Sequence, residues 1–375
     1  MSRARIENEV LAWMEESPWK ADPARFERLA LALFRFQFAH CEPYARFCRS
    51  LERTPAKVTR IEEIPAVPTG AFKEFDLRSF DPVTTIKTFR TSGTSSDRRG
   101  RLHLDTLRLY ETSLLASLGM TLLDDPPDRE PILRFLAPPP EEVPDSSLTH
   151  MFATLLGRRG GPESGFDLRA GALDLDGIAD AIANARRVDR PIVLLGTSFA
   201  FVHLLDATAE TEGDVWRLPP DSRVMETGGF KGRSREIPPD ALRTELAGRF
   251  GIPETSIVNQ YGMTELGSQF YDSTWIDPSG PRRKLVPPWT RIRVIDPATG
   301  EDAPAGEVGL IVVHDLANTG SVAAIETADL GRSLRDADGE AIGFEILGRF
   351  EGAEARGCSI ATDVMLAASQ DGDPR

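Results

Sequence analysis

The most reactive side chain of this sequence lies near its end, where Cys358 follows Arg356 and Gly357. A thiolate can attack an activated carbonyl and carry the acyl group as a thioester. Arg356 would favour the thiolate form modestly. A lone cysteine in such a tail is also a common structural residue, so the residues alone leave both interpretations of Cys358 open.

Residues 91–96 read Thr-Ser-Gly-Thr-Ser-Ser and combine hydroxyl groups with one glycine. Such a loop lets the backbone approach a phosphate chain closely and offers N–H donors to it. It is not a Walker A loop, because no Gly-Lys-Ser/Thr follows. The nearby cations, Arg98, Arg99 and Arg101, could hold phosphates or only solvate the loop, and a plain turn is the alternative.

A third polar segment, Tyr261-Gly262-Met263-Thr264-Glu265, follows the strand-like residues 256–258. A carboxylate beside a hydroxyl at a strand end suits Mg²⁺ next to phosphates, because Mg²⁺ prefers hard oxygen ligands. Glu265 is therefore the candidate metal ligand. The alternative is a polar loop with Tyr261 packed inside.

Alternating strands and helices must position these segments. Short β-branched or apolar runs predict strands at residues 83–89, 191–198 and 222–229, and a helix at 199–207 follows the second. This alternation favours an α/β architecture with largely parallel pairing. A β-rich piece is expected later in the chain, with strands at residues 291–296 and 308–314.

The N-terminal part is predicted to be helical, at residues 3–16 and 25–53, from the spacing of its apolar residues. Cys41 and Cys48 are seven residues apart, so on one helix they would share a face as small buried residues. With three scattered cysteines in total, no disulfide framework or zinc site is expected.

Composition and charge argue against a nucleic-acid-binding, secreted or membrane-spanning protein. The formal net charge of −14 would repel nucleic acid. The N-terminus lacks the apolar core of a secretory signal, and no segment has the roughly 20 apolar residues of a membrane span. Hydrophobic residues make up 41% and charged residues 27%, which fits a globular protein, and we expect a cytoplasmic location.

Five segments occur in the order and spacing of the adenylate-forming superfamily: residues 91–94, 227–229, 261–265, 327–331 and 348–349. Within it the chain resembles the acyl-protein synthetases of the LuxE type, the long-chain fatty acid protein ligases of bacterial fatty acid reductase complexes. The sequence resembles this family most closely at residues 226–232, 261–265, 268–269, 315–318 and 356–359.

The resemblance implies an α/β fold like the N-terminal domain of adenylate-forming enzymes, with a helical N-terminal segment and a β-rich C-terminal part. It implies three regions: a helical segment at 1–60, an adenylate-forming core at 61–350 and a short tail at 351–375. The usual mobile C-terminal domain, with its catalytic lysine, is expected to be absent, because few residues follow Arg349. The usual phosphate-loop lysine is also missing.

The resemblance further implies roles for the matching residues. The ATP phosphates would be held by Thr91, Ser92, Gly93 and Thr94. The adenine and acyl pocket would be formed by Gly228, Gly229, Tyr261 and Gly262. Thr264 and Glu265 would face the phosphates and Mg²⁺, Asp329 would bind the ribose, and Arg349 would assist. Cys358 would be the acyl acceptor.

The activity implied by the resemblance is ATP- and Mg²⁺-dependent conversion of a fatty acid to acyl-AMP, followed by transfer to Cys358. The implied partner is a reductase of the acyl-CoA-reductase type, which would take the acyl group. Two alternatives stay open: a ligase that makes free acyl-CoA, like the phenylacetate–CoA ligases, and a non-catalytic nucleotide-binding subunit.

Overall fold

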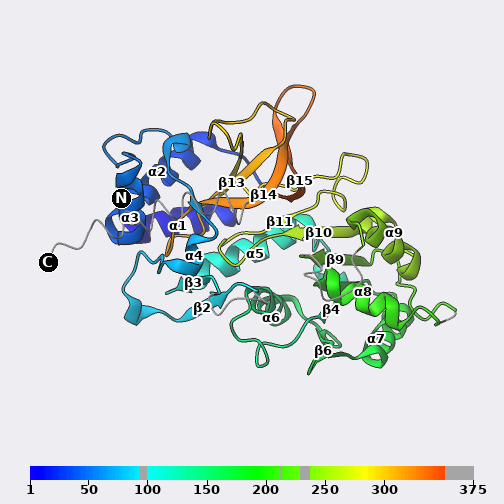
Figure 1. Ribbon diagram of the computed structural model, residues 1–375. Helices are drawn as coiled ribbons and strands as arrows, with labels where there is room; N and C mark the ends of the chain where they lie inside the picture. Colours follow the sequence, from blue (N-terminus) through cyan, green and yellow to red (C-terminus); the bar gives the residue numbers. More distant parts are fainter. Residues whose placement is uncertain (93–98, 212, 229–236, 351–375) are drawn as a thin grey trace. The chain divides into compact units, whose positions relative to one another are not determined.

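The computed structural model describes residues 1–92, 99–211, 213–228 and 237–350 (Figure 1). Contacts divide the chain into two units. Unit 1 holds residues 1–116, 263–269 and 283 onward, and unit 2 holds residues 117–262 and 270–282. The predicted region boundaries at residues 60 and 350 stay a prediction.

Unit 1 begins with three helices, α1 (Arg3–Met14), α2 (Pro23–His40) and α3 (Glu42–Ser50). The prediction of one helix over 25–53 is wrong. Cys41 is extended, with φ −116° and ψ 92°, and the next helix begins at Glu42 with Pro43 as its second residue. In a continuous helix the ring of Pro43 would clash with the carbonyl four residues earlier. Cys41 and Cys48 are fully buried, as expected.

A hairpin follows in unit 1, made of β2 (Lys87–Arg90) and β3 (Arg101–Leu104). The predicted strand over 83–89 is wrong in its first half, because residues 82–84 form a 3-10 turn. The Asp81 carboxylate accepts a hydrogen bond from the Val83 N–H at 3.0 Å and begins that turn. The smaller helical elements of this part are α4 (Ala71–Glu74), η1 (Ile61–Glu63) and η2 (Pro82–Thr84).

The main sheet of unit 1 has the order β1-β14-β13-β12, and β15 pairs with β14. Its strands are β1 (Val67–Pro68), β12 (Thr290–Ile295), β13 (Gly309–Asp315), β14 (Ala324–Arg335) and β15 (Ala341–Arg349). Only the short β1 pairs in parallel. The β-rich piece predicted after residue 290 is therefore confirmed.

Unit 2 contains a six-stranded sheet with the order β11-β10-β9-β8-β4-β5. Its strands are β4 (Ile132–Leu136), β5 (Gly165–Phe166), β8 (Ile192–Thr197), β9 (Arg223–Thr227), β10 (Ile257–Tyr261) and β11 (Phe270–Tyr271). All pairs are parallel except β10–β11. The predicted parallel α/β core is confirmed, with strands at two of the predicted positions, 191–198 and 222–229. A small hairpin joins β6 (Leu168–Arg169) and β7 (Ala172–Leu173).

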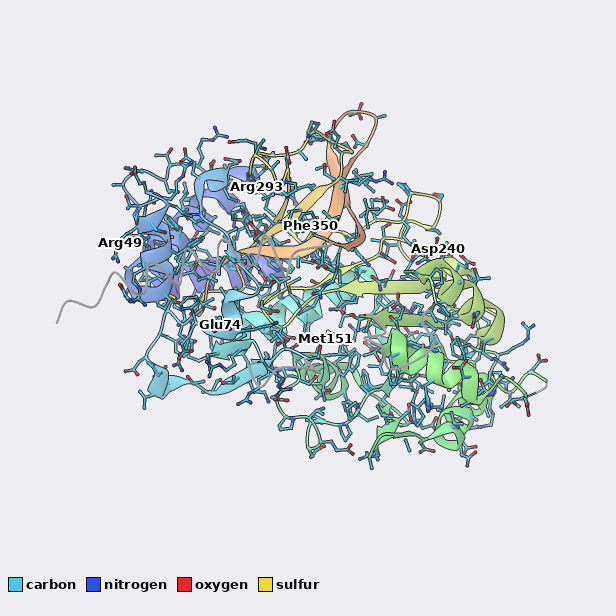
Figure 2. All side chains as sticks on the ribbon, viewed as in Figure 1. Arg49, Glu74, Met151, Asp240, Arg293 and Phe350 are labelled. Atoms are coloured by element: carbon cyan, nitrogen blue, oxygen red, sulfur yellow. The ribbon has the colours of Figure 1, made fainter. Side chains whose placement is uncertain are left out.

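Helices cover both faces of this sheet. The chain supplies α6 (Ser147–Arg159), α7 (Leu175–Arg187), α8 (Ser198–Ala207) and α9 (Pro239–Phe250), with η3 (Pro127–Arg129) and η4 (Glu254–Ser256). The helices α7, α8 and α9 can be followed in Figure 1, and their apolar side chains form one buried cluster with residues of β4, β8 and β9. The opposite face packs on α6: Phe135 contacts Phe152, and the Tyr271 hydroxyl donates to the sulfur of Met151, which is labelled in Figure 2.

The remaining helix, α5 (Arg108–Thr121), contributes residues to both units. Among the residues that the structure describes, no helix has both the length and the apolar character that a membrane span requires.

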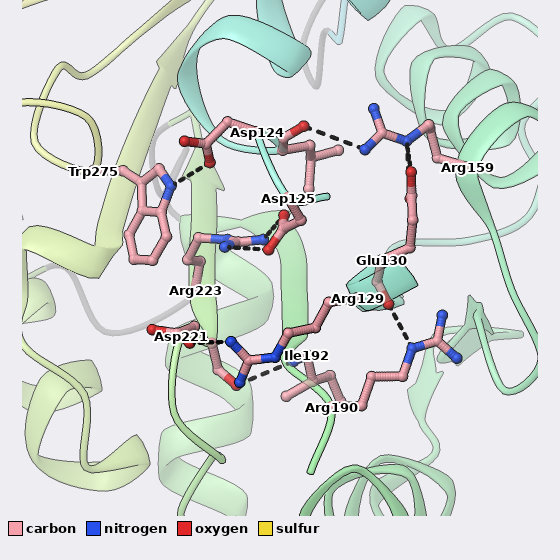
Figure 3. A network of polar contacts seen from close by, with 12 residues as sticks. Asp124, Asp125, Arg129, Glu130, Arg159, Arg190, Ile192, Asp221, Arg223 and Trp275 are labelled. Atoms are coloured by element: carbon pink, nitrogen blue, oxygen red, sulfur yellow. Dashed lines mark hydrogen bonds and ion pairs between the residues drawn. The ribbon is translucent and has the colours of Figure 1, made fainter. Parts of the chain in front are cut away.

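A buried ion pair fixes the N-terminal end of β9. The Arg223 guanidinium is fully buried, forms two hydrogen bonds with the Asp125 carboxylate and lies 4.5 Å from the Trp275 ring centroid (Figure 3). The Trp275 indole N–H donates to Asp124 at 2.9 Å. A buried guanidinium requires such partners, because an unpaired buried charge is strongly destabilising.

Candidate functional site

The predicted site residues fall in both units. Gly228, Tyr261 and Gly262 belong to unit 2, whereas the remaining described ones belong to unit 1: Thr91, Ser92, Thr264, Glu265, Asp329 and Arg349. The boundary therefore passes through the Tyr261–Glu265 motif. Four predicted site residues lie outside the described part of the chain: Gly93, Thr94, Gly229 and Cys358.

In unit 1 the predicted phosphate loop connects the two strands of the β2–β3 hairpin. Two hydrogen bonds close its base: the Thr91 N–H donates to the Gly100 carbonyl, and the Gly100 N–H donates to the Thr91 hydroxyl, both at 2.9 Å. The Glu265 carboxylate lies beside this base. A Cβ at Gly100 would be 3.5 Å from Glu265 Oε1 and 3.0 Å from Thr91 Cγ2. The structure thus brings together two segments about 170 residues apart in sequence.

Glu265 is buried in a turn in which the Leu266 N–H donates to the Met263 carbonyl. The residues that hold this turn are not among the predicted site residues. The Asn318 side-chain amide donates to the Glu265 carbonyl at 2.8 Å, and the Asp315 carboxylate accepts from the Gly267 N–H at 2.8 Å. The sequence signal that could have found them is the resemblance of residues 315–318 to the family. Thr264 lies half-buried in the same turn.

Asp329 and Arg349 are cross-strand partners on β14 and β15. The Arg349 Nε lies 3.6 Å from the Asp329 carboxylate, in an ion pair whose arginine is largely exposed. The Thr327 hydroxyl donates to the Ile311 carbonyl and accepts from the Asp329 N–H at 3.2 Å. These bonds hold the backbone at Asp329. The structure thus pairs Asp329 with Arg349, which lie in two separate sequence motifs.

In unit 2, Gly228 follows the last residue of β9 and has φ +82°, a conformation that favours glycine. The Ser198 hydroxyl donates to the Gly228 carbonyl at 2.9 Å and also bonds the Glu226 carboxylate. Among the residues that the structure describes, none has an atom within 4 Å of a Cβ built at Gly228. Tyr261 ends the neighbouring strand β10, with its ring 6.1 Å from that of Phe270.

These unit 2 residues lie at the carboxyl ends of parallel strands, which is where open α/β sheets bind their ligands. A cavity of about 400 Å³ lies at the opposite ends of the strands, with Ser222, Pro253 and Trp275 in its lining. The predicted site residues are not part of that cavity.

The donor set at Glu265 fits magnesium delivered with a nucleotide. No cluster of three or more His, Cys, Asp or Glu side chains exists within residues 1–92, 99–211, 213–228 and 237–350 that could hold a metal by itself. Mg²⁺ usually takes one or two protein carboxylates, with phosphate oxygens and water completing its shell. A single carboxylate at the base of a small-residue loop is compatible with that arrangement.

The two described cysteines are unsuited to nucleophilic chemistry. Burial raises the pKa of the Cys41 thiol to about 11 and that of the Cys48 thiol to about 12. Neither residue is exposed, and both are free of disulfides. The nucleophile of a thiol reaction is the thiolate, which these surroundings disfavour at neutral pH.

Comparison with known proteins identifies the family. Residues 6–367 match the family described as acyl-protein synthetase, LuxE. A relative from Vibrio harveyi, named "Long-chain-fatty-acid--luciferin-component ligase", is 24% identical over 92% of this chain and 89% of its own. A relative of the same name from Aliivibrio fischeri is 24% identical over 89% of this chain and 87% of its own.

Among solved structures, a 2-hydroxyisobutyryl-CoA ligase in complex with 2-HIB-AMP and CoA is similar in fold. Its open conformation has a TM-score of 0.62 at 14% identity, and the match covers 88% of this chain and 76% of that one. The fold is thus that of adenylate-forming ligases. With the family match extending over nearly the whole sequence, the chain belongs to the LuxE family of acyl-protein synthetases.

Proposed function

We propose that this protein uses ATP to convert a long-chain fatty acid to acyl-AMP and then transfers the acyl group to its own Cys358. Family membership, the adenylate-forming fold and the names of the relatives support acyl activation. The observation that carries the proposal is the closeness of Glu265 to the base of the Thr91–Gly100 loop, where its Oε1 would lie 3.5 Å from a Cβ at Gly100. It places a carboxylate beside a loop of phosphate-binding composition.

In the first step a carboxylate oxygen of the fatty acid attacks the α-phosphorus of ATP. The new oxygen–phosphorus bond forms as the bond to the bridging oxygen breaks, and diphosphate leaves. Thr91, Ser92, Gly93 and Thr94 would hold the phosphates, while Asp329 would accept hydrogen bonds from the ribose and fix the nucleotide. Glu265 would hold the Mg²⁺ that arrives with ATP and offsets charge on the diphosphate.

In the second step the Cys358 thiolate attacks the acyl carbonyl of acyl-AMP. The carbon–sulfur bond forms, the carbon–oxygen bond to phosphate breaks, and AMP leaves. The burial and raised pKa of Cys41 and Cys48 support this assignment, because the sequence holds only three cysteines. The final acceptor would be a reductase of the acyl-CoA-reductase type, a partner in keeping with the luciferin-component names of the relatives.

The adenylation step is tested by exchange of labelled diphosphate into ATP. With Mg²⁺ present, exchange is expected to depend on a medium- or long-chain fatty acid and to need no CoA. Absence of exchange over a series of acids, with the partner reductase added, would favour a non-catalytic nucleotide-binding subunit. Exchange followed by release of acyl-CoA, without acylation of the protein, would favour the acyl-CoA ligase.

A further inference from the structure

The loop that joins β13 to β14, residues 316–323, is almost entirely buried within unit 1. A buried loop must find hydrogen-bond partners for its backbone groups, because unpaired polar groups away from water are costly. We call residues 316–323 the connecting loop and residues 263–269, which carry Glu265, the carboxylate segment. The partners of the connecting loop come from both the carboxylate segment and the N-terminal helices.

Toward the carboxylate segment, Asn318 is the central contact. Its Nδ2 donates both to the Glu265 carbonyl at 2.8 Å and to the Val322 carbonyl at 2.9 Å within its own loop. Asp315, at the end of β13, adds a second attachment by accepting from the Gly267 N–H and the Ser268 hydroxyl, both at 2.8 Å. The backbone around Glu265 is therefore held by the ends of β13 and its loop.

Toward the N-terminal helices, the central contact is Gln37 of α2, whose side chain is 1% exposed. Its Nε2 donates to the Asn318 carbonyl at 2.9 Å, and its Oε1 accepts from the Ala323 N–H at 3.0 Å. One primary amide thus bridges two distant points of the connecting loop. Glutamine suits this position because it combines a donor and an acceptor on one planar group.

Helix α1 adds a peripheral contact. The Thr319 hydroxyl donates to the Glu7 carboxylate at 2.8 Å, and Arg3 pairs with both Glu7 and Asp105. The N-terminal helices therefore contact the connecting loop at several points, although none of the nucleotide motifs lies in them.

We propose that Gln37 is a positioning residue that acts through Asn318 to hold Glu265 against the base of the phosphate loop. This inference rests on the proposed function for its effect on catalysis. It gives the N-terminal helices a defined part in adenylation: they set the place of the metal-binding carboxylate. A displacement of catalytic groups by about 1 Å can lower the reaction rate by about a hundredfold.

The test variant is Gln37→Met, which keeps the length of the side chain and removes both hydrogen bonds. The matched control is Tyr44→Phe. Tyr44 is equally buried in the N-terminal helices and donates one hydrogen bond to the Pro65 carbonyl at 2.9 Å, away from the connecting loop. If Gln37→Met does not fold, Gln37→Asn takes its place, because it retains the amide but shortens its reach.

Diphosphate exchange gives the first measurement. Gln37→Met is expected to lower kcat by between about tenfold and about a hundredfold, whereas Tyr44→Phe is expected to leave kcat unchanged. In a Glu265→Gln background, Gln37→Met should cause no further loss, because its effect passes through Glu265. Losses that multiply, or an unchanged kcat in the Gln37 variant, would overturn the proposal.

Hydrogen exchange of the peptide that holds Gly267 and Ser268 gives a second measurement that needs no activity. Exchange there should be faster in the Gln37 variant than in wild type and unchanged in Tyr44→Phe. If the wild-type protein shows no diphosphate exchange but this difference is present, the proposed function fails while the positioning stands. Equal hydrogen exchange in wild type and the Gln37 variant would refute the positioning itself.

Discussion

His314 on β13 is a fully buried imidazole whose titration can be followed through stability. Its Nε2 is buried without a hydrogen-bond partner in the described part of the chain. Burial, and then the nearby Arg293 (labelled in Figure 2) and Arg291, lowers the pKa of His314 from 6.5 to about 3. The folded protein therefore keeps this side chain neutral at pH values where the unfolded chain protonates it.

The sign of the effect follows from proton binding. Below pH 6.5 the unfolded chain binds a proton that the folded protein does not, so stability present above pH 6.5 is lost as the pH falls toward 3. The loss is about 1.4 kcal/mol per pH unit, or about 2 kcal/mol between pH 6.5 and pH 5. His314→Leu removes the titrating group and fills similar volume.

The assay is denaturant unfolding of both proteins between pH 7.5 and pH 5. The variant must be compared with wild type because two buried carboxyls also titrate. Burial raises the pKa of Asp315 to about 6 and that of Glu326 to about 7, so these two groups stabilise the folded protein as the pH falls. As the pH falls from 7.5 to 5, the free energy of unfolding of His314→Leu should rise by about 2 kcal/mol relative to that of wild type. If the difference does not change with pH, folded His314 accepts a proton as readily as the unfolded chain does, and its pKa is not lowered by burial.

Three further substitutions test the site and the core. Glu265→Gln should lower diphosphate exchange by about a hundredfold or more with little change in melting temperature, and an equally active variant would remove Glu265 from the metal site. Asp125→Asn should cost about 3–5 kcal/mol in denaturant unfolding because it leaves buried Arg223 without its counter-ion. Arg129→Ala breaks only the exposed pair with Asp221 and should cost less than about 1 kcal/mol, and equal losses would contradict the burial argument.

Much of the fold could be predicted because its signals are local. The strand at residues 192–197 begins with the apolar run Ile-Val-Leu-Leu, and it lies inside the parallel sheet, between β4 and β9. Local signals also misled. The β-branched residues 83–85 do not form a strand because Asp81 and Pro82 begin a turn, and Pro43 interrupts a helical pattern that otherwise continues.

The site was predictable as a set of motifs but not as a geometry. Thr91, Glu265 and Asp329 stand out in sequence because each lies in a short run of recognisable composition. Three contacts depend on strand register and long-range packing. These are the bond of Gly100 to Thr91, the pairing of Asp329 with Arg349, and the support of Glu265 by Asn318 and Gln37. A single sequence does not contain that information in any local pattern.

In the proposed reaction the activated acyl group moves to Cys358 and forms a thioester. The most direct measurement is labelling of the protein with radioactive fatty acid, ATP and Mg²⁺, in wild type and in Cys358→Ser. Cys358→Ser is expected to form acyl-AMP still but to lose the hydroxylamine-sensitive label, while Cys41→Ser and Cys48→Ser should keep both. Normal labelling of Cys358→Ser would contradict self-acylation and favour direct transfer from acyl-AMP to the partner.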